Sequence, residues 1–152
     1  MGRGSRTALV LSTYAPTRGR FLWTLGRYDE AEALAQLGRE LGDEQDAATQ
    51  GTWREVAALV RASRGEYEEA ERLAREAVAI SARTDAPMWQ GDALNDLAEV
   101  LQLAGRTYEA AAALEQAVEQ YERKRNLPLA EQARARLAEL RASLPVTAEK
   151  DR

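Results

Sequence analysis

The side chains able to do chemistry in this chain are almost all carboxylates and guanidiniums. The sequence holds 25 Asp and Glu and 21 Lys and Arg, with no histidine and no cysteine. The absence of those two residue types excludes disulfides, thiolate nucleophiles, imidazole bases and the usual ligands of zinc, copper and haem. Catalysis or metal binding would have to be built from carboxylates.

The densest group of acids is formed by Glu66, Glu68, Glu69 and Glu71. Arg72 lies four residues after Glu68, and a helix would place the two on one face. Arg75 stands in the same relation to Glu71, so both pairs predict a solvated, salt-bridged helix surface rather than a carboxylate pair for acid–base catalysis. There is no calcium-binding loop and no glycine-rich phosphate loop. We therefore expect no enzyme, no metal and no cofactor.

The elements that position these charges are set by a phrase of six residues that occurs three times, at residues 26–31, 65–70 and 105–110. Each copy begins with glycine, contains tyrosine and acids, and ends with alanine. The glycines are 39 and 40 residues apart. A fixed period of that size is typical of stacked helical hairpins rather than of a single globular core.

Each phrase predicts the turn between two antiparallel helices. The left-handed residues that end the first helix of each pair are expected to be Gly26, Gly65 and Gly105. The acids that follow would lie in the first turn of the next helix, where its dipole favours them. Apolar residues then recur at spacings of three and four. Small residues at Ala31, Ala70 and Ala110 would let the paired helices approach closely.

The connections between pairs carry start and stop signals. Asp85 is interpreted as an N-cap with Pro87 in the first turn, and Asn126 as a left-handed C-cap. One more amphipathic helix follows Pro128, and its inward residues are expected to be Ala133, Leu137, Ala138, Leu140 and Leu144. It has no partner helix and would cap the end of the stack.

The predicted fold is an all-α, right-handed superhelical solenoid of three helix pairs plus a C-terminal capping helix, seven helices in all. Its predicted parts are a flexible segment at 1–10, a repeat domain at 11–144 and a disordered tail at 145–152. Within the repeat domain the pairs would cover about 11–46, 47–86 and 87–126, with the capping helix at 128–144. Pro16 and Gly19 leave two courses open for the first helix, which either kinks there or begins near Thr17.

The Gly-x-Tyr-x-x-Ala turn between helices with small residues resembles the tetratricopeptide repeat. Residues 90–101 and 103–106 resemble the C-terminal repeats of large actinobacterial-type regulators. In those regulators an adenylate/guanylate cyclase domain or a transcriptional activator domain precedes an ATPase module and a helical-repeat array. The resemblance implies a non-catalytic module that binds a peptide or a partner protein in its concave groove. Its alternative is a C-terminal regulatory or sensor segment of a multidomain signalling ATPase, cyclase or transcriptional regulator.

Carrying over the concave positions of that family by register gives a partner-binding surface of Arg20, Trp23, Thr52, Glu55, Leu59, Asp92, Asn95, Glu99 and Gln102, which Gln132 and Glu139 would extend. The acids favour a basic or neutral extended peptide. The set of basic residues with which some tetratricopeptide domains clamp a terminal carboxylate is missing. An alternative is that these residues merely solvate a groove within a larger assembly. Trp53 and Trp89 are interpreted as wedges between repeats rather than as anchors for a partner.

Charge and hydropathy limit the other partners. The formal net charge is −4, which disfavours nucleic acid, and no run of 18 apolar residues could cross a membrane. We expect a cytoplasmic protein of bacterial signalling type. Self-association through the uncapped first helix is a further possibility.

Overall fold

The computed structural model describes residue 15 and residues 18–145, and these residues form helices and connections without a strand. A leading helical segment covers residues 18–24. It is followed by α2 (Tyr28–Leu41), α3 (Ala47–Ser63), α4 (Tyr67–Ala82), α5 (Pro87–Leu103), α6 (Thr107–Arg123) and α7 (Leu127–Ser143). The predicted segment 1–10, the tail beyond Pro145, and Pro16 and Thr17 all lie outside the described residues.

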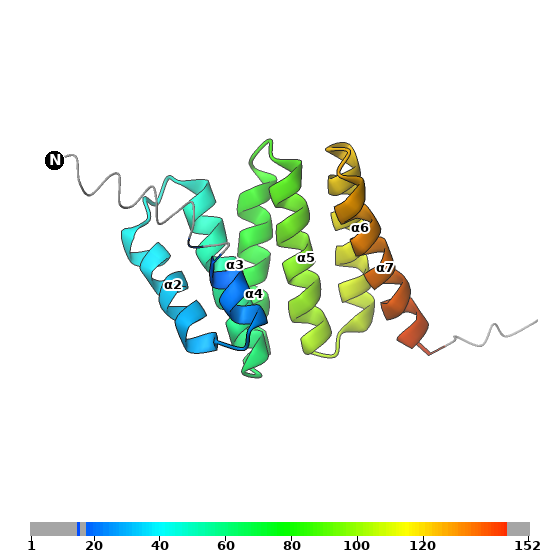
Figure 1. Ribbon diagram of the computed structural model, residues 1–152, viewed down its shortest axis with the longest axis horizontal. Helices are drawn as coiled ribbons and strands as arrows, with labels where there is room; N and C mark the ends of the chain where they lie inside the picture. The colour runs from blue at the N-terminus through cyan, green and yellow to red at the C-terminus, as the bar shows by residue number, and fades with distance from the viewer. Residues whose placement is uncertain (1–14, 16–17, 146–152) are drawn as a thin grey trace, which may run out of the picture.

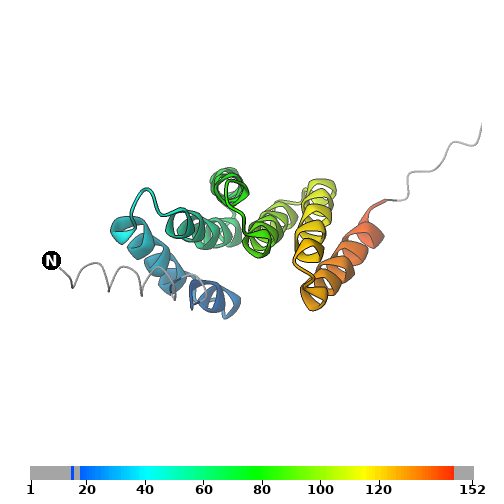
Figure 2. The same ribbon diagram turned by 90° about the horizontal axis from the view of Figure 1, so that it is seen from above.

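The helices stand side by side in chain order (Figure 1), and each packs against the next along the sequence. In addition, α3 contacts α5 directly. Seen from above, the leading segment and the start of α7 reach toward one side of the stack, and α5 is set back between them (Figure 2). This is the stack of antiparallel helix pairs that the sequence predicts, with its concave face between the leading segment and α7.

The turns within the pairs follow from backbone conformation. Gly26, Gly65 and Gly105 have φ values of 72°, 82° and 77°, as predicted for left-handed residues. The amide after each glycine donates to a carbonyl five residues earlier, which satisfies the end of the preceding helix. A fourth turn of this kind joins α6 to α7. There Arg125 has the positive φ of 56°, so the prediction of Asn126 as the left-handed residue is wrong.

Asn126 instead begins α7, where its side chain accepts a hydrogen bond from the Leu129 amide at 3.1 Å. Asp46 caps α3 in a similar way by accepting from the amide of Ala48. The prediction of Asp85 as a cap is wrong as well. Because Pro87 is the first residue of α5, the cap position falls on Ala86, which has no side chain to accept a bond.

Alanines allow the helices of each pair to pack closely. Ala31, Ala70 and Ala110 are each 0% exposed, as the phrase predicts. Leucines from neighbouring pairs fill the space between them, and Leu59, Leu101 and Leu114 are among the largest fully buried side chains. The stack therefore has a continuous apolar interior along its length.

The capping helix buries Ala133, Leu137 and Leu140 as predicted. Ala138 is exposed, contrary to the prediction, because the inward stripe of α7 runs through residues three and four apart and position 138 lies beside it.

The acids at the start of α4 form a salt-bridged surface. Glu71 binds Arg75 at 2.8 Å, as predicted. Arg72 contacts Glu69 and Glu76 instead of the predicted Glu68. The bond of Glu71 to Arg106, in the turn of the next pair, was not predicted and ties two repeats together.

Candidate binding site on the concave face

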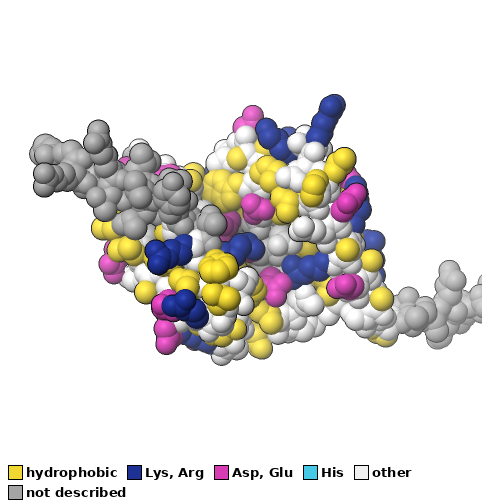
Figure 3. All heavy atoms as spheres, viewed as in Figure 1, with side chains coloured by type: hydrophobic (Ala, Val, Ile, Leu, Met, Phe, Trp, Pro, Cys, Tyr) yellow, Lys and Arg dark blue, Asp and Glu magenta, His cyan; other side chains and the backbone are white. Residues whose placement is uncertain are grey.

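A pocket of about 240 Å³ opens on the concave face, where the leading segment meets α3 and α5. Its lining residues are Arg20, Thr52, Glu55, Val56, Leu59, Trp89, Asp92 and Asp96. Acidic and basic side chains gather in the hollow at the middle of this face (Figure 3). We call this cavity the concave pocket. Five of the nine residues predicted for partner binding line it.

An ion pair crosses the concave pocket from the leading segment to α5. The guanidinium of Arg20 donates to Oδ1 of Asp96, whose residue is only 1% exposed. The close approach of the leading segment to α3 depends on Gly19, since a Cβ there would lie 3.0 Å from a methyl carbon of Val56. The ion pair thus joins the first repeat to the third across α3.

Glu55 lies at the centre of the concave pocket and is 8% exposed. The indole N–H of Trp89 in α5 donates to its Oε1 at 2.9 Å. The indole ring fits against α3 because Gly51 has no side chain, as a Cβ there would come within 2.2 Å of the ring. The interpretation of Trp89 as a wedge between successive repeats is therefore confirmed.

Asp92 lies one turn before Asp96 on α5 and accepts a hydrogen bond from the hydroxyl of Tyr121 at 2.7 Å. Tyr121 belongs to α6 and packs against Gly91, where an added Cβ would lie 2.7 Å from the ring. A glycine thus makes room for an aromatic ring at the start of both α3 and α5, and each ring donates to a carboxylate of the concave pocket.

The carboxylates of the concave pocket have perturbed protonation. Burial raises the pKa of Glu55 to about 8, and the negative charge of Asp96 adds to this effect, while the Trp89 hydrogen bond and Arg20 oppose it. Burial also raises the pKa of Asp96, against the opposing charge of Arg20. Glu55 is therefore mostly protonated at neutral pH and can respond to a nearby positive charge.

One acceptor in the concave pocket is left without a donor. Oδ2 of Asp96 is buried and has no hydrogen-bond partner among the described residues. A buried carboxylate oxygen in this state costs free energy, which a donor from a bound molecule would recover.

The C-terminal part of the predicted surface is occupied by a side chain of the capping helix. Arg136 in α7 donates to Asn95 at 3.3 Å and to Gln102 at 3.0 Å. It also forms an ion pair with Glu99, which neutralises the acid there. Arg136 is not among the residues predicted from the sequence, although it lies four residues after Gln132 and hence on the same side of α7. Gln132 and Glu139 are exposed on α7.

Trp23 and Leu59, the remaining predicted residues, are held within the fold. The indole N–H of Trp23 donates to the carbonyl of Leu59 at 3.1 Å and to the hydroxyl of Ser63 at 2.8 Å. Leu59 is 1% exposed and forms part of the wall of the concave pocket. Trp23 therefore fixes the leading segment to α3.

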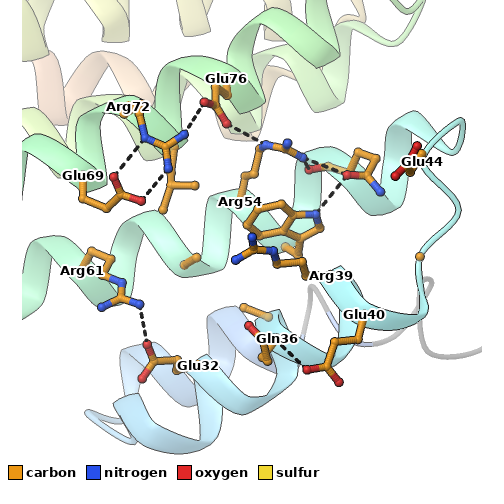
Figure 4. A pocket seen from close by; sticks show the side chains of 16 residues that line it. Glu32, Gln36, Arg39, Glu40, Glu44, Arg54, Arg61, Glu69, Arg72 and Glu76 are labelled. Atoms are coloured by element: carbon orange, nitrogen blue, oxygen red, sulfur yellow. Dashed lines mark hydrogen bonds and ion pairs between the residues drawn. The ribbon is translucent and has the colours of Figure 1, made fainter.

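A second, larger cleft of about 520 Å³ lies on the opposite side of α3, between α2 and α4 (Figure 4). Most of its charged side chains are paired with one another. Arg54 binds Glu76 at 2.9 Å, and Arg61 binds Glu32 at 3.1 Å. The ring of Trp53 lines this second cleft, and the guanidinium carbon of Arg54 lies 4.3 Å from the centroid of the ring. Because these groups satisfy each other, the concave pocket is the better candidate for binding.

Between residue 15 and residue 145, the described residues include no group of three or more acids placed to hold a metal ion. Among the helices described, none has both the length and the apolar character needed to cross a membrane.

Comparison with known proteins agrees with this geometry. No curated protein matches the chain. The family model of the tetratricopeptide repeat matches residues 49–123, which run from α3 to the end of α6. The match does not extend to the finer resemblance to actinobacterial-type regulators, which stays a prediction. The repeat match and the stack of helix pairs together show an all-α fold of the tetratricopeptide-like solenoid type.

Proposed function

We propose that this protein is a non-catalytic interaction module that binds an extended segment of a partner protein along its concave face. Tetratricopeptide repeats generally mediate protein–protein interactions. The observation that carries the proposal is the concave pocket, where Arg20, Glu55 and Asp92 converge from two repeats and the leading segment. The groove would extend from there past Asn95 and Gln102 toward α7.

The charge of the groove favours a basic segment. Glu55 and Asp92 are the acids that such a segment would meet, since Glu99 is already paired with Arg136. Like charges across an interface disfavour association, so an acidic segment would be rejected. The predicted regulatory role in a multidomain ATPase or cyclase would use the same groove against a neighbouring module.

The test compares the two faces of α3. Thr52→Arg would fill the concave pocket, and Gln36→Arg would add the same charge to the second cleft. Both proteins and the wild type are used to capture partners from an extract of the source cell, after circular dichroism has verified their helix content. We expect a partner that Thr52→Arg loses and Gln36→Arg retains. A partner lost only with Gln36→Arg would place the interaction on the second cleft and contradict the proposal.

A further inference from the structure

The concave pocket has more carboxyl groups than guanidiniums. The carboxyl groups are those of Glu55, Asp92 and Asp96. Arg20 supplies the one guanidinium among the lining residues, and it is bound to a single oxygen of Asp96. A second positive group would therefore meet more carboxyl groups than Arg20 pairs with.

The second observation is the orphaned oxygen of Asp96. The side chain of Asp96 is 2% exposed, and its Oδ2 has no hydrogen-bond partner among the residues that the structure describes. A hydrogen-bond donor that entered the concave pocket would satisfy this oxygen, and a charged donor would do so most strongly.

The walls and size of the concave pocket suit one side chain. Val56, Leu59 and Trp89 give it apolar walls on which a methylene stem can pack. Its volume of about 240 Å³ is smaller than the roughly 300–1,000 Å³ of sites that hold whole small-molecule ligands.

We infer that the concave pocket receives one cationic side chain of the partner, the ammonium of a lysine or the guanidinium of an arginine, which contacts Asp96, Glu55 and Asp92. This inference rests on the proposed function, because it names the residue by which the extended partner is anchored. The cation would lie beside Arg20 and donate to the free oxygen of Asp96.

Binding of the cation should release a proton from Glu55. The charged groups facing Glu55 are Arg20 on the leading segment and Asp92 and Asp96 on α5. The charged side chains of α2 and α4 that flank α3 line the second cleft instead. A nearby positive charge favours the ionised carboxylate. The affinity of the concave pocket for the cationic side chain should therefore rise about tenfold per pH unit between about pH 6 and 8.

The test uses the Trp89 indole as a reporter in nuclear magnetic resonance. The protein has three tryptophans, so ¹⁵N-tryptophan labelling gives few indole signals, and loss of one in Trp89→Phe assigns it. The probes are N-acetyl-lysine methylamide and N-acetyl-arginine methylamide, with N-acetyl-norleucine methylamide as the uncharged control. We expect a saturable shift of the Trp89 signal with one or both cationic probes, and the probe that binds identifies the anchoring residue.

Matched variants separate binding from structure. Glu55→Gln keeps the side-chain shape and the acceptor for Trp89, and it should weaken the cationic probe about tenfold or more and abolish the pH dependence. Glu44→Gln makes the same substitution on the exposed rim of the second cleft, and it should change neither the affinity for the probe nor its pH dependence.

The inference is overturned if neither cationic probe gives a saturable shift, if norleucine gives the same shift, or if the affinity is independent of pH. In that case, a partner that the wild type captures and Thr52→Arg loses would still support the proposed function, but without a cationic anchor in the concave pocket. If the cationic probe binds but Thr52→Arg still captures the partner, the proposed function is contradicted and the cation site is not.

Discussion

Replacing Glu55 with glutamine should remove a large pH dependence from the stability of this protein. Burial raises the pKa of Glu55 from an ordinary value of 4.5 to about 8. The folded state therefore binds a proton that the unfolded chain has lost over this range. The resulting stability is fully present below about pH 4.5 and is lost as the pH rises through about 8.

The magnitude follows from the two pKa values. The difference between 4.5 and about 8, at 1.36 kcal/mol per pKa unit, corresponds to about 5 kcal/mol. Glutamine is always neutral and keeps the acceptor for the Trp89 indole, so the variant escapes this loss. Relative to the wild type, Glu55→Gln should gain several kcal/mol between about pH 5 and about pH 8.5.

The assay is urea unfolding at a series of pH values, followed by circular dichroism. The chain has no histidine and no cysteine, so apart from Asp96, whose pKa is raised by burial, few other side chains titrate between about pH 6 and 8. Glu44→Gln serves as the control, because it makes the same substitution at an exposed position outside the concave pocket. The reasoning would be refuted if the difference in unfolding free energy between Glu55→Gln and the wild type were the same at about pH 5 and at about pH 8.5.

Three further predictions concern the repeat architecture. Ala70→Asp should destabilise the stack by about 3 kcal/mol or more, because it buries an unpaired charge between helices. Ala79→Asp, on the exposed side of α4, should cost little. Thermal unfolding measures both, and equal effects would mean that the helix faces are misassigned. Arg125→Gly should stabilise the folded protein by about 1 kcal/mol, because glycine adopts the positive φ of 56° without strain. Lys124→Gly, at a right-handed position, should give no such gain, and urea unfolding that shows Arg125→Gly to be destabilised would contradict this prediction. Gly51→Ala should cost about 1–3 kcal/mol, because the new methyl would lie 2.2 Å from the neighbouring indole, and an unchanged unfolding midpoint would show that the ring moves freely.

The repeat architecture could be predicted from the sequence because local rules determine it. Gly26, Gly65 and Gly105 occupy backbone conformations that glycine alone adopts without cost, and the spacing of the apolar residues sets which face of each helix is buried. The turn at Arg125 could not be predicted in this way, because the pairing of α6 with α7 holds a residue other than glycine at positive φ.

The candidate site could be predicted only in part. The repeat register placed Thr52, Glu55 and Asp92 on the concave face, where the structure also has them. Asp96 was missed, although it lies three residues after Ala93 on the inward stripe of α5, which was a usable signal. Its partner Arg20 is 76 positions away in the sequence, and no local pattern indicates a contact across that separation.

The most direct test of the concave face as the binding site is photo-crosslinking from a single residue on each side of α3. A benzophenone amino acid is placed at Thr52 in the concave pocket, or at Gln36 in the second cleft, and the crosslinked peptides are sequenced by mass spectrometry. We predict that position 52 captures a partner segment with a lysine or arginine beside the crosslink and that position 36 captures none. Crosslinks to the same partner from position 36 alone would contradict the account.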